Sequence, residues 1–131
     1  MKPYTSTYKI YYEDTDISGV VYHANYLKFF ERGRTDFLSS KGFQLKSLIE
    51  EGIQFVAADL SIEYKKPAQL NDDVIVLTDL EDIKGARLVF KQTMLRNQND
   101  LLCEAKIVVG CLDLKFKVVR LPARLKQELK P

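Results

Sequence analysis

The sequence predicts an α+β fold in which one long helix covers a face of an antiparallel sheet. Residues 23–40 repeat their apolar side chains with a helical period. Four later segments alternate or run apolar between short polar turns, a pattern typical of strands joined to antiparallel neighbours. The chain has 131 residues, the usual size of one compact domain, so we expect a single domain over residues 1–131.

The helix expected over residues 23–40 is the clearest element. Before it, Thr7–Tyr12 alternates and predicts a strand, and residues 13–19 are polar and turn-like. The apolar side of the helix is formed by Tyr26, Phe30, Gly33 and Phe37. Gly42 follows its end, where a left-handed residue commonly closes a helix. Gly33 should cost the helix about 1 kcal/mol relative to alanine, so we expect close contact with another backbone there.

The remaining segments complete the predicted architecture. A short helix is expected over Gln44–Glu51, ended by Gly52. Strands are expected as a meander over Ile53–Tyr64, Val74–Leu80, Ala86–Arg96 and Leu101–Asp113. Near the C-terminus, Pro122 and leucines at positions 121, 125 and 129 predict a short amphipathic helix. Residues 115–131 hold six basic side chains and one acid, so this tail is suited to an anionic surface such as lipid or an acidic carrier protein.

Composition excludes several classes of function. A net charge of +2 is too weak for general nucleic-acid binding, so no nucleic-acid partner is expected. His23, Cys103 and Cys111 are too few and too scattered for a metal site, and we expect no metal. The cysteines lie in apolar, strand-like sequence and are expected to be buried, reduced thiols. With no apolar leader and no run of membrane-spanning length, these features predict a cytoplasmic protein.

The side chains with chemical potential are concentrated just before the helix. They are Glu13, Asp14, Asp16 and His23. A calcium loop fits poorly because Asn25 stands where an EF-hand needs glutamate, and a serine triad lacks its G-x-S-x-G elbow. A third interpretation sets a carboxylate beside the free N–H groups of the helix start, where it could activate water or attack an acyl carbonyl. The structural alternative is that Asp14 and Asp16 only form turns and cap the helix.

A longer signature runs through this loop and into the helix. It consists of Tyr11-Tyr12-Glu13-Asp14-Thr15-Asp16, Gly19-Val20-Val21-Tyr22-His23-Ala24-Asn25-Tyr26 and Phe30-Glu31-Arg32, with Ile62–Ala68 and Lys84–Arg87 in addition. On these residues the chain resembles the hotdog-fold thioesterases of the 4-hydroxybenzoyl-CoA thioesterase family, in particular the acyl-CoA thioesterases encoded with the Tol-Pal envelope system. The resemblance implies a hotdog fold, a long central helix wrapped by an antiparallel β-sheet. It also implies dimers joined sheet to sheet, often paired into tetramers, with active sites at the dimer interface.

The resemblance further implies roles for individual residues. Asp16 matches the family's catalytic aspartate, as general base or nucleophile, and the backbone N–H of His23 matches the oxyanion donor. Tyr22 and Asn25 belong to the same motif and are expected to shape the substrate site. The cationic candidates for the CoA phosphates are Lys65, Lys66 and Arg87. The carboxylates expected to be structural or outside the reacting centre are Glu13, Asp14 and Glu31.

The loop chemistry and the resemblance together imply a cytoplasmic acyl-CoA thioester hydrolase that releases free acid and CoA and uses no cofactor. The alternative is a non-catalytic acyl-CoA or acyl-carrier-protein binding module of the same fold. A hydratase of acyl thioesters is a further rival, although the His/Asp arrangement of hotdog hydratases is not found in the sequence. A homo-oligomer is expected, either a dimer or a tetramer, and the basic tail is the candidate for contact with acyl carrier protein or the inner-membrane surface.

Overall fold

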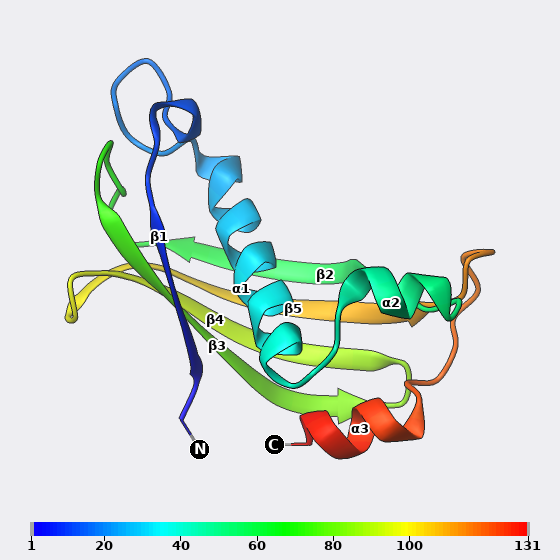
Figure 1. Cartoon of the computed structure of the whole chain (residues 1–131). Coiled ribbons are helices and arrows are strands. Elements are labelled where there is room, and N and C mark those ends of the chain that lie inside the picture. The colour runs from blue at the N-terminus through cyan, green and yellow to red at the C-terminus, as the bar shows by residue number, and fades with distance from the viewer. Residues whose placement is uncertain (1, 131) are drawn as a thin grey trace.

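A computed structural model describes residues 2–130 and shows one five-stranded antiparallel sheet in the order β1-β3-β4-β5-β2. The strands are β1 (Tyr4–Lys9), β2 (Gln54–Tyr64), β3 (Asp73–Lys84), β4 (Arg87–Arg96) and β5 (Asp100–Leu112). The helices are α1 (Tyr26–Ser40), α2 (Leu45–Glu50) and α3 (Ala123–Leu129). Figure 1 shows α1 lying across one face of the sheet. The predicted α+β fold, with a long helix covered by an antiparallel sheet, is confirmed.

The helical run begins where the sequence predicts. A 3-10 turn, η2 (His23–Asn25), leads directly into α1, which ends at Ser40. The side of α1 that is buried consists of Tyr26, Phe29, Phe30, Gly33, Phe37 and Leu38. Gly42 has a φ of +91°, the left-handed conformation that a non-glycine residue adopts with difficulty. The helix therefore forms because one apolar stripe meets the alternately buried side chains of β3 and β4.

At the point where α1 crosses the sheet, Gly33 makes the closest approach. A Cβ atom on Gly33 would lie 2.8 Å from Cγ1 of Val76 and 2.9 Å from Oγ1 of Thr78. The expected close contact is confirmed, but its partners are side chains of β3 and the Gln92 amide of β4, at 3.1 Å, and not another backbone. Gln92, fully buried on β4, fixes the crossing by donating from Nε2 to the Phe30 carbonyl at 2.8 Å and to Thr78 Oγ1 at 2.9 Å.

The first strand lies earlier than the sequence predicts. We expected Thr7–Tyr12, whereas β1 spans Tyr4–Lys9 and Tyr12 belongs to a 3-10 turn, η1 (Tyr12–Asp14). The Asp14 carboxylate accepts the N–H of Tyr11 at 2.9 Å, and this bond turns the chain out of the extended direction. Local hydrogen bonding by a short acidic side chain therefore overrides the alternating pattern.

The strand order also corrects the predicted meander. Only β3, β4 and β5 follow one another, whereas β2 pairs with β5, with Gln54 opposite Leu112 and Tyr64 opposite Cys103. Residues 65–72 therefore carry the chain from one edge strand to a strand near the other edge. Within residues 2–130, β2 is left as an edge strand with one unpaired side.

The C-terminal helix packs on the core as its leucines predict. The leucines at positions 121, 125 and 129 are 6%, 0% and 2% exposed, and Arg124 pairs with Glu51 at 2.6 Å.

Cys103 and Cys111 are buried free thiols, as expected, and burial raises the pKa of Cys103 to about 12. None of the helices in the described part of the chain is both long enough and apolar enough to cross a membrane.

Candidate active site

The loop that carries Asp16 is a small closed hairpin immediately before the helical run. The Tyr22 N–H donates to the Asp14 carbonyl at 3.2 Å, and the Asp16 N–H donates to the Val20 carbonyl at 2.9 Å. Gly19 reverses the chain at a φ of +81°, in the left-handed region that favours glycine. The loop is thus held by its own backbone, with the Asp16 side chain exposed to solvent.

The Asp16 carboxylate uses one of its two oxygens within this loop. Oδ1 accepts the Ser18 hydroxyl at 2.6 Å and the Ser18 N–H at 2.9 Å. These bonds, the hydroxyl first, hold the pKa of Asp16 below its ordinary value, so the group is ionised at neutral pH. Within residues 2–130 both of these bonds fall on Oδ1, and the nearby Val20 N–H lowers the pKa of Asp16 further. Asp16 therefore forms a turn, as the structural alternative expected, but uses only Oδ1 for its bonds to Ser18.

The neighbouring acid, Asp14, has a purely structural set of contacts. It is only 7% exposed, and besides binding the Tyr11 N–H it offers its carbonyl to Nδ2 of Asn25 at 2.9 Å. This second bond ties the loop to the residue where the 3-10 turn meets α1. The amide of Asn25 is used to shape the site, and its expected contact with substrate stays a prediction.

The helical run starts at His23 with unused hydrogen-bonding capacity. In the described part of the chain, no acceptor contacts the His23 N–H, as is usual for the first turn of a helix. The His23 carbonyl accepts the Tyr64 hydroxyl at 2.7 Å, and the exposed imidazole lies 4.4 Å from the Tyr22 ring. Val20, whose carbonyl accepts the Asp16 N–H, precedes His23 by only three residues. Three residues span roughly 10 Å at most in an extended chain, so the backbone that pairs with Asp16 lies within that distance of His23.

Segment 65–72 supports the loop from outside. The Val21 N–H donates to the Ala68 carbonyl at 2.8 Å, and the Leu70 N–H donates to the Gly19 carbonyl at 3.1 Å. Tyr26 accepts the Ala68 N–H at its hydroxyl at 3.0 Å, and its ring meets that of Tyr64 edge to face at 5.3 Å. These contacts join the end of β2, the start of the helix and the Asp16 loop into one unit.

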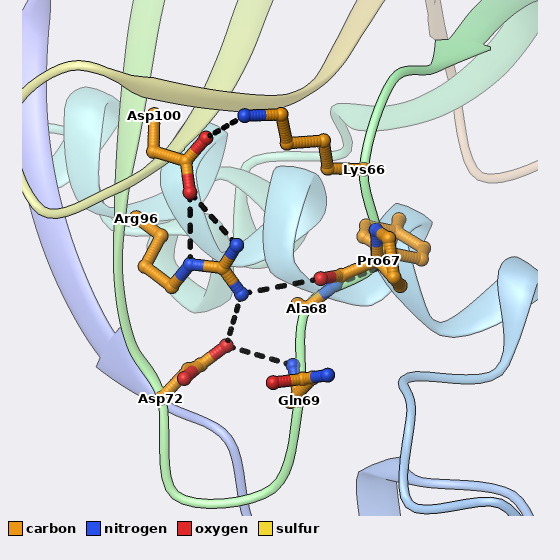
Figure 2. A network of polar contacts seen from close by, with 8 residues as sticks. Lys66, Pro67, Ala68, Gln69, Asp72, Arg96 and Asp100 are labelled. Carbon is orange, nitrogen blue, oxygen red and sulfur yellow. Dashed lines mark hydrogen bonds and ion pairs between the residues drawn. The ribbon is translucent and has the colours of Figure 1, made fainter.

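Figure 2 shows the charged network that holds segment 65–72. Arg96 binds Asp100 at 2.7 Å, Asp72 at 3.0 Å and the Pro67 carbonyl at 3.3 Å. Asp72 in turn accepts the Gln69 N–H at 2.8 Å. The network fixes the backbone on which the Asp16 loop rests, a role that sequence reasoning missed because Arg96 lies far from the loop in the chain.

The three cationic candidates do not come together in one chain. Lys65 pairs with Glu63 at 2.9 Å, and Lys66 pairs with Asp100 at 2.7 Å, both at the Asp16 end of the sheet. Arg87 begins β4, which ends at Arg96, nine residues or roughly 30 Å away. Within a single subunit, Arg87 therefore lies at the opposite end of the sheet from the two lysines.

A cleft of about 520 Å³ opens between α1, α2 and the sheet at the β2 edge. Its walls include Leu27, Leu38, Val56, Leu60 and Phe90. Val56 and Leu60 remain 38% and 42% exposed. One feature of the sequence could have indicated this cleft: β2 carries apolar residues on both of its faces. A strand with one face in water would instead alternate apolar and polar residues. Among residues 2–130, no cluster of three or more His, Cys, Asp or Glu side chains is placed to hold a metal ion.

Comparison with known proteins gives consistent matches over nearly the whole chain. Residues 11–129 match the model of the Thioesterase-like superfamily. The chain is 44% identical to the acyl-CoA thioesterase YbgC of Haemophilus influenzae, over 90% of this chain and 88% of that protein. It is 42% identical to the acyl-CoA thioester hydrolase YbgC of Escherichia coli O6:H1, over 93% and 92%. The crystal structure of a probable thioesterase from Bartonella henselae superposes with a TM-score of 0.84 at 35% identity, covering 93% of this chain and 100% of that one.

Proposed function

Because the chain belongs to the Thioesterase-like superfamily, we propose that it hydrolyses acyl-CoA thioesters to free acid and CoA, with Asp16 acting on the thioester carbonyl. The observation that carries this proposal is the exposed, ionised Asp16 carboxylate, which uses only Oδ1 for its bonds to Ser18 on a hydrogen-bonded loop directly before the helix start. The names of the YbgC relatives, at 42% and 44% identity over most of the chain, support the choice of acyl-CoA as the substrate class.

In the proposed reaction, the thioester carbonyl lies against the start of the helical run. The His23 N–H and the positive end of the helix dipole stabilise the oxyanion that forms as the carbonyl carbon becomes tetrahedral. Asp16 takes a proton from the attacking water, the C–S bond breaks, and the proton passes to the departing CoA thiolate. In the variant route Asp16 attacks the carbonyl itself, the C–S bond breaks and CoA leaves as the thiolate, and water then hydrolyses the mixed anhydride to free acid and the Asp16 carboxylate. Because a thiolate leaves readily, neither route needs a strong general acid.

We propose that two copies join along β2 to complete the site. The unpaired side of β2 and the exposed apolar side chains of Val56, Leu60 and Tyr64 support this contact, since a long apolar edge strand otherwise invites aggregation. Antiparallel pairing of β2 with its copy would bring the Arg87 end of one sheet towards the Lys65 end of the other. Sedimentation is expected to give at least twice the 15.1 kDa chain mass, and a monomer at micromolar concentration would contradict the proposal.

The discriminating experiment follows free thiol release from a panel of acyl-CoA substrates of increasing chain length. Turnover of at least one substrate supports the hydrolase. Tight acyl-CoA binding without thiol release would instead support the non-catalytic binding module.

The proposed contacts of the basic tail with acyl carrier protein or lipid stay predictions. Because Leu125 and Leu129 are buried, substituting exposed lysines of the tail tests them better than truncation, which would remove part of the core.

Removing the Ser18 hydroxyl is expected to move the acidic limb of the pH profile. The hydroxyl is the largest cause of the lowered pKa of Asp16, so Ser18→Ala should raise this pKa towards its ordinary value. Since the ionised carboxylate is the active form, activity that is lost as pH falls should then be lost at a higher pH. The acidic limb of kcat/KM reports the shift, with Ser18→Thr as the matched variant that keeps a hydroxyl. Coincident limbs for wild type and Ser18→Ala would contradict the role of Asp16.

A further inference from the structure

The cleft beside β2 is mainly apolar but contains one half-buried guanidinium. Its deeper wall is built from Leu38, Phe55, Leu88, Phe90, Ile107 and Val109. The charged residues that line it are Lys28, Glu31 and Arg34, of which Lys28 and Glu31 are exposed and Arg34 is half-buried. This cleft differs from a purely apolar acyl-binding cleft, because a guanidinium that is partly removed from water needs hydrogen-bonding or ionic partners.

Arg34 is held in place by a neutral partner. Its Nη1 donates to Oε1 of Gln92 at 3.0 Å, and the amide of Gln92 is itself fixed by its two bonds to Phe30 and Thr78. In the described part of the chain, no carboxylate lies within ion-pair distance of Arg34. Burial lowers the pKa of Arg34, and nearby Glu31 acts in the opposite direction. The guanidinium therefore has a fixed orientation and donors to spare.

We propose that Arg34 binds the distal end of an acyl group that carries oxygen there, a terminal carboxylate best of all. This inference deepens the proposed acyl-CoA hydrolysis and rests on it. A carboxylate can accept two parallel N–H bonds from a guanidinium and neutralise its charge in an apolar cleft, which a methyl end cannot do. The substrate class is then ω-carboxy-acyl thioesters in preference to simple fatty acyl thioesters.

The position of Arg34 sets the length of the acyl group. Leu27 is the first residue of α1 that lines the cleft, in the first turn of the helix and close to where the thioester would react. From Leu27 to Arg34 is seven residues, or about 10 Å along the helix axis. Long side chains on helices point back towards the helix N-terminus, which brings the guanidinium of Arg34 within reach of the end of a medium-length acyl chain. An eight-carbon acyl group is accordingly the probe of choice.

The test compares three thioesters that differ only at the last carbon: octanoyl-CoA, 8-hydroxyoctanoyl-CoA and suberoyl-CoA. For the wild-type protein, kcat/KM for suberoyl-CoA is expected to exceed that for octanoyl-CoA by about tenfold or more, the scale of hydrogen bonds to a charged group, with the hydroxy substrate between them. Arg34→Met should remove this preference and Arg34→Lys should keep part of it. Arg32→Met is the matched control, because Arg32 lies on the same helix over the Phe29 ring, 5.1 Å from its centre, outside the cleft.

The outcomes separate the inference from the function on which it rests. Hydrolysis of octanoyl-CoA as fast as or faster than both oxygenated substrates by wild type overturns the inference but leaves the hydrolase standing, even if Arg34→Met does not fold. A preference that persists in folded Arg34→Met or is lost equally in Arg32→Met overturns the role of Arg34. Absence of thiol release from every substrate overturns the proposed function itself.

Discussion

Replacement of Asp16 by asparagine is expected to lower kcat at least about 100-fold while the protein stays folded. Asparagine keeps an oxygen that can accept the two Ser18 bonds, so the loop retains its shape. It carries no negative charge and takes up a proton far less readily, so it can neither activate water nor attack the carbonyl. Thiol release from acyl-CoA measures the effect, and circular dichroism of the variant confirms its fold.

Asp14→Asn is the matched control for Asp16→Asn. It changes the other acid of the same loop, whose carboxylate accepts the Tyr11 N–H and faces away from solvent, so its kcat should stay within a few-fold of wild type. Near wild-type turnover by folded Asp16→Asn would refute the assignment. Single-turnover hydrolysis in isotopically labelled water then separates the two roles, because label enters the Asp16 carboxyl only if this residue attacks the carbonyl.

Gly33→Val is expected to destabilise the protein by about 3 kcal/mol, the upper range for overpacking a core. The Cβ atom alone would lie 2.8 Å from Cγ1 of Val76 and 3.1 Å from Nε2 of Gln92, and valine adds two further methyl groups. The helix must then move away from the sheet or Gln92 must give up its hydrogen bonds. Thermal unfolding should show the midpoint falling by about 10 °C for a domain of this size.

Gly110→Ala provides the comparison for this core position. Gly110 lies on β5, and the nearest atoms to a Cβ there are 3.9 Å away, an ordinary contact distance. Its Tm should therefore change by no more than a few degrees. Equal Tm values for Gly33→Val and wild type would show that α1 does not approach the sheet as closely as the geometry indicates.

Local periodicity predicted the elements better than it predicted their arrangement. The helical run from His23 and the short helix ended by Gly52 lie where the sequence indicates, because each depends on neighbours within a few residues. The limits of β1 were wrong because a single bond from Asp14 competes with the alternating pattern. The predicted place of β2 in the sheet was wrong, although its residue range was not. The order of strands depends on which strand edges meet in space, and the turns next to β2 do not specify which strand it pairs with.

The candidate site shows the same division. The Asp16 loop and the helix start were visible in the sequence because they are contiguous, spanning Asp14 to His23. The network of Arg96 and the contact of Tyr64 with the His23 carbonyl were not. The first depends on the pairing of β4 with β3 and β5, and the second on the start of the helical run lying against the end of β2. Arg87, grouped with Lys65 and Lys66 by charge, lies at the other end of the sheet in the folded chain.

By itself, the sequence determined that a charged carboxylate precedes the first turn of a long helix, since a short loop cannot separate residues so close in the chain. Only the tertiary structure decided what surrounds this pair: an edge strand left open, and a cleft with the Arg34 guanidinium fixed by Gln92. The physical reason is that the burial and electrostatics of a side chain depend on every element packed around it, and those elements come from distant parts of the chain.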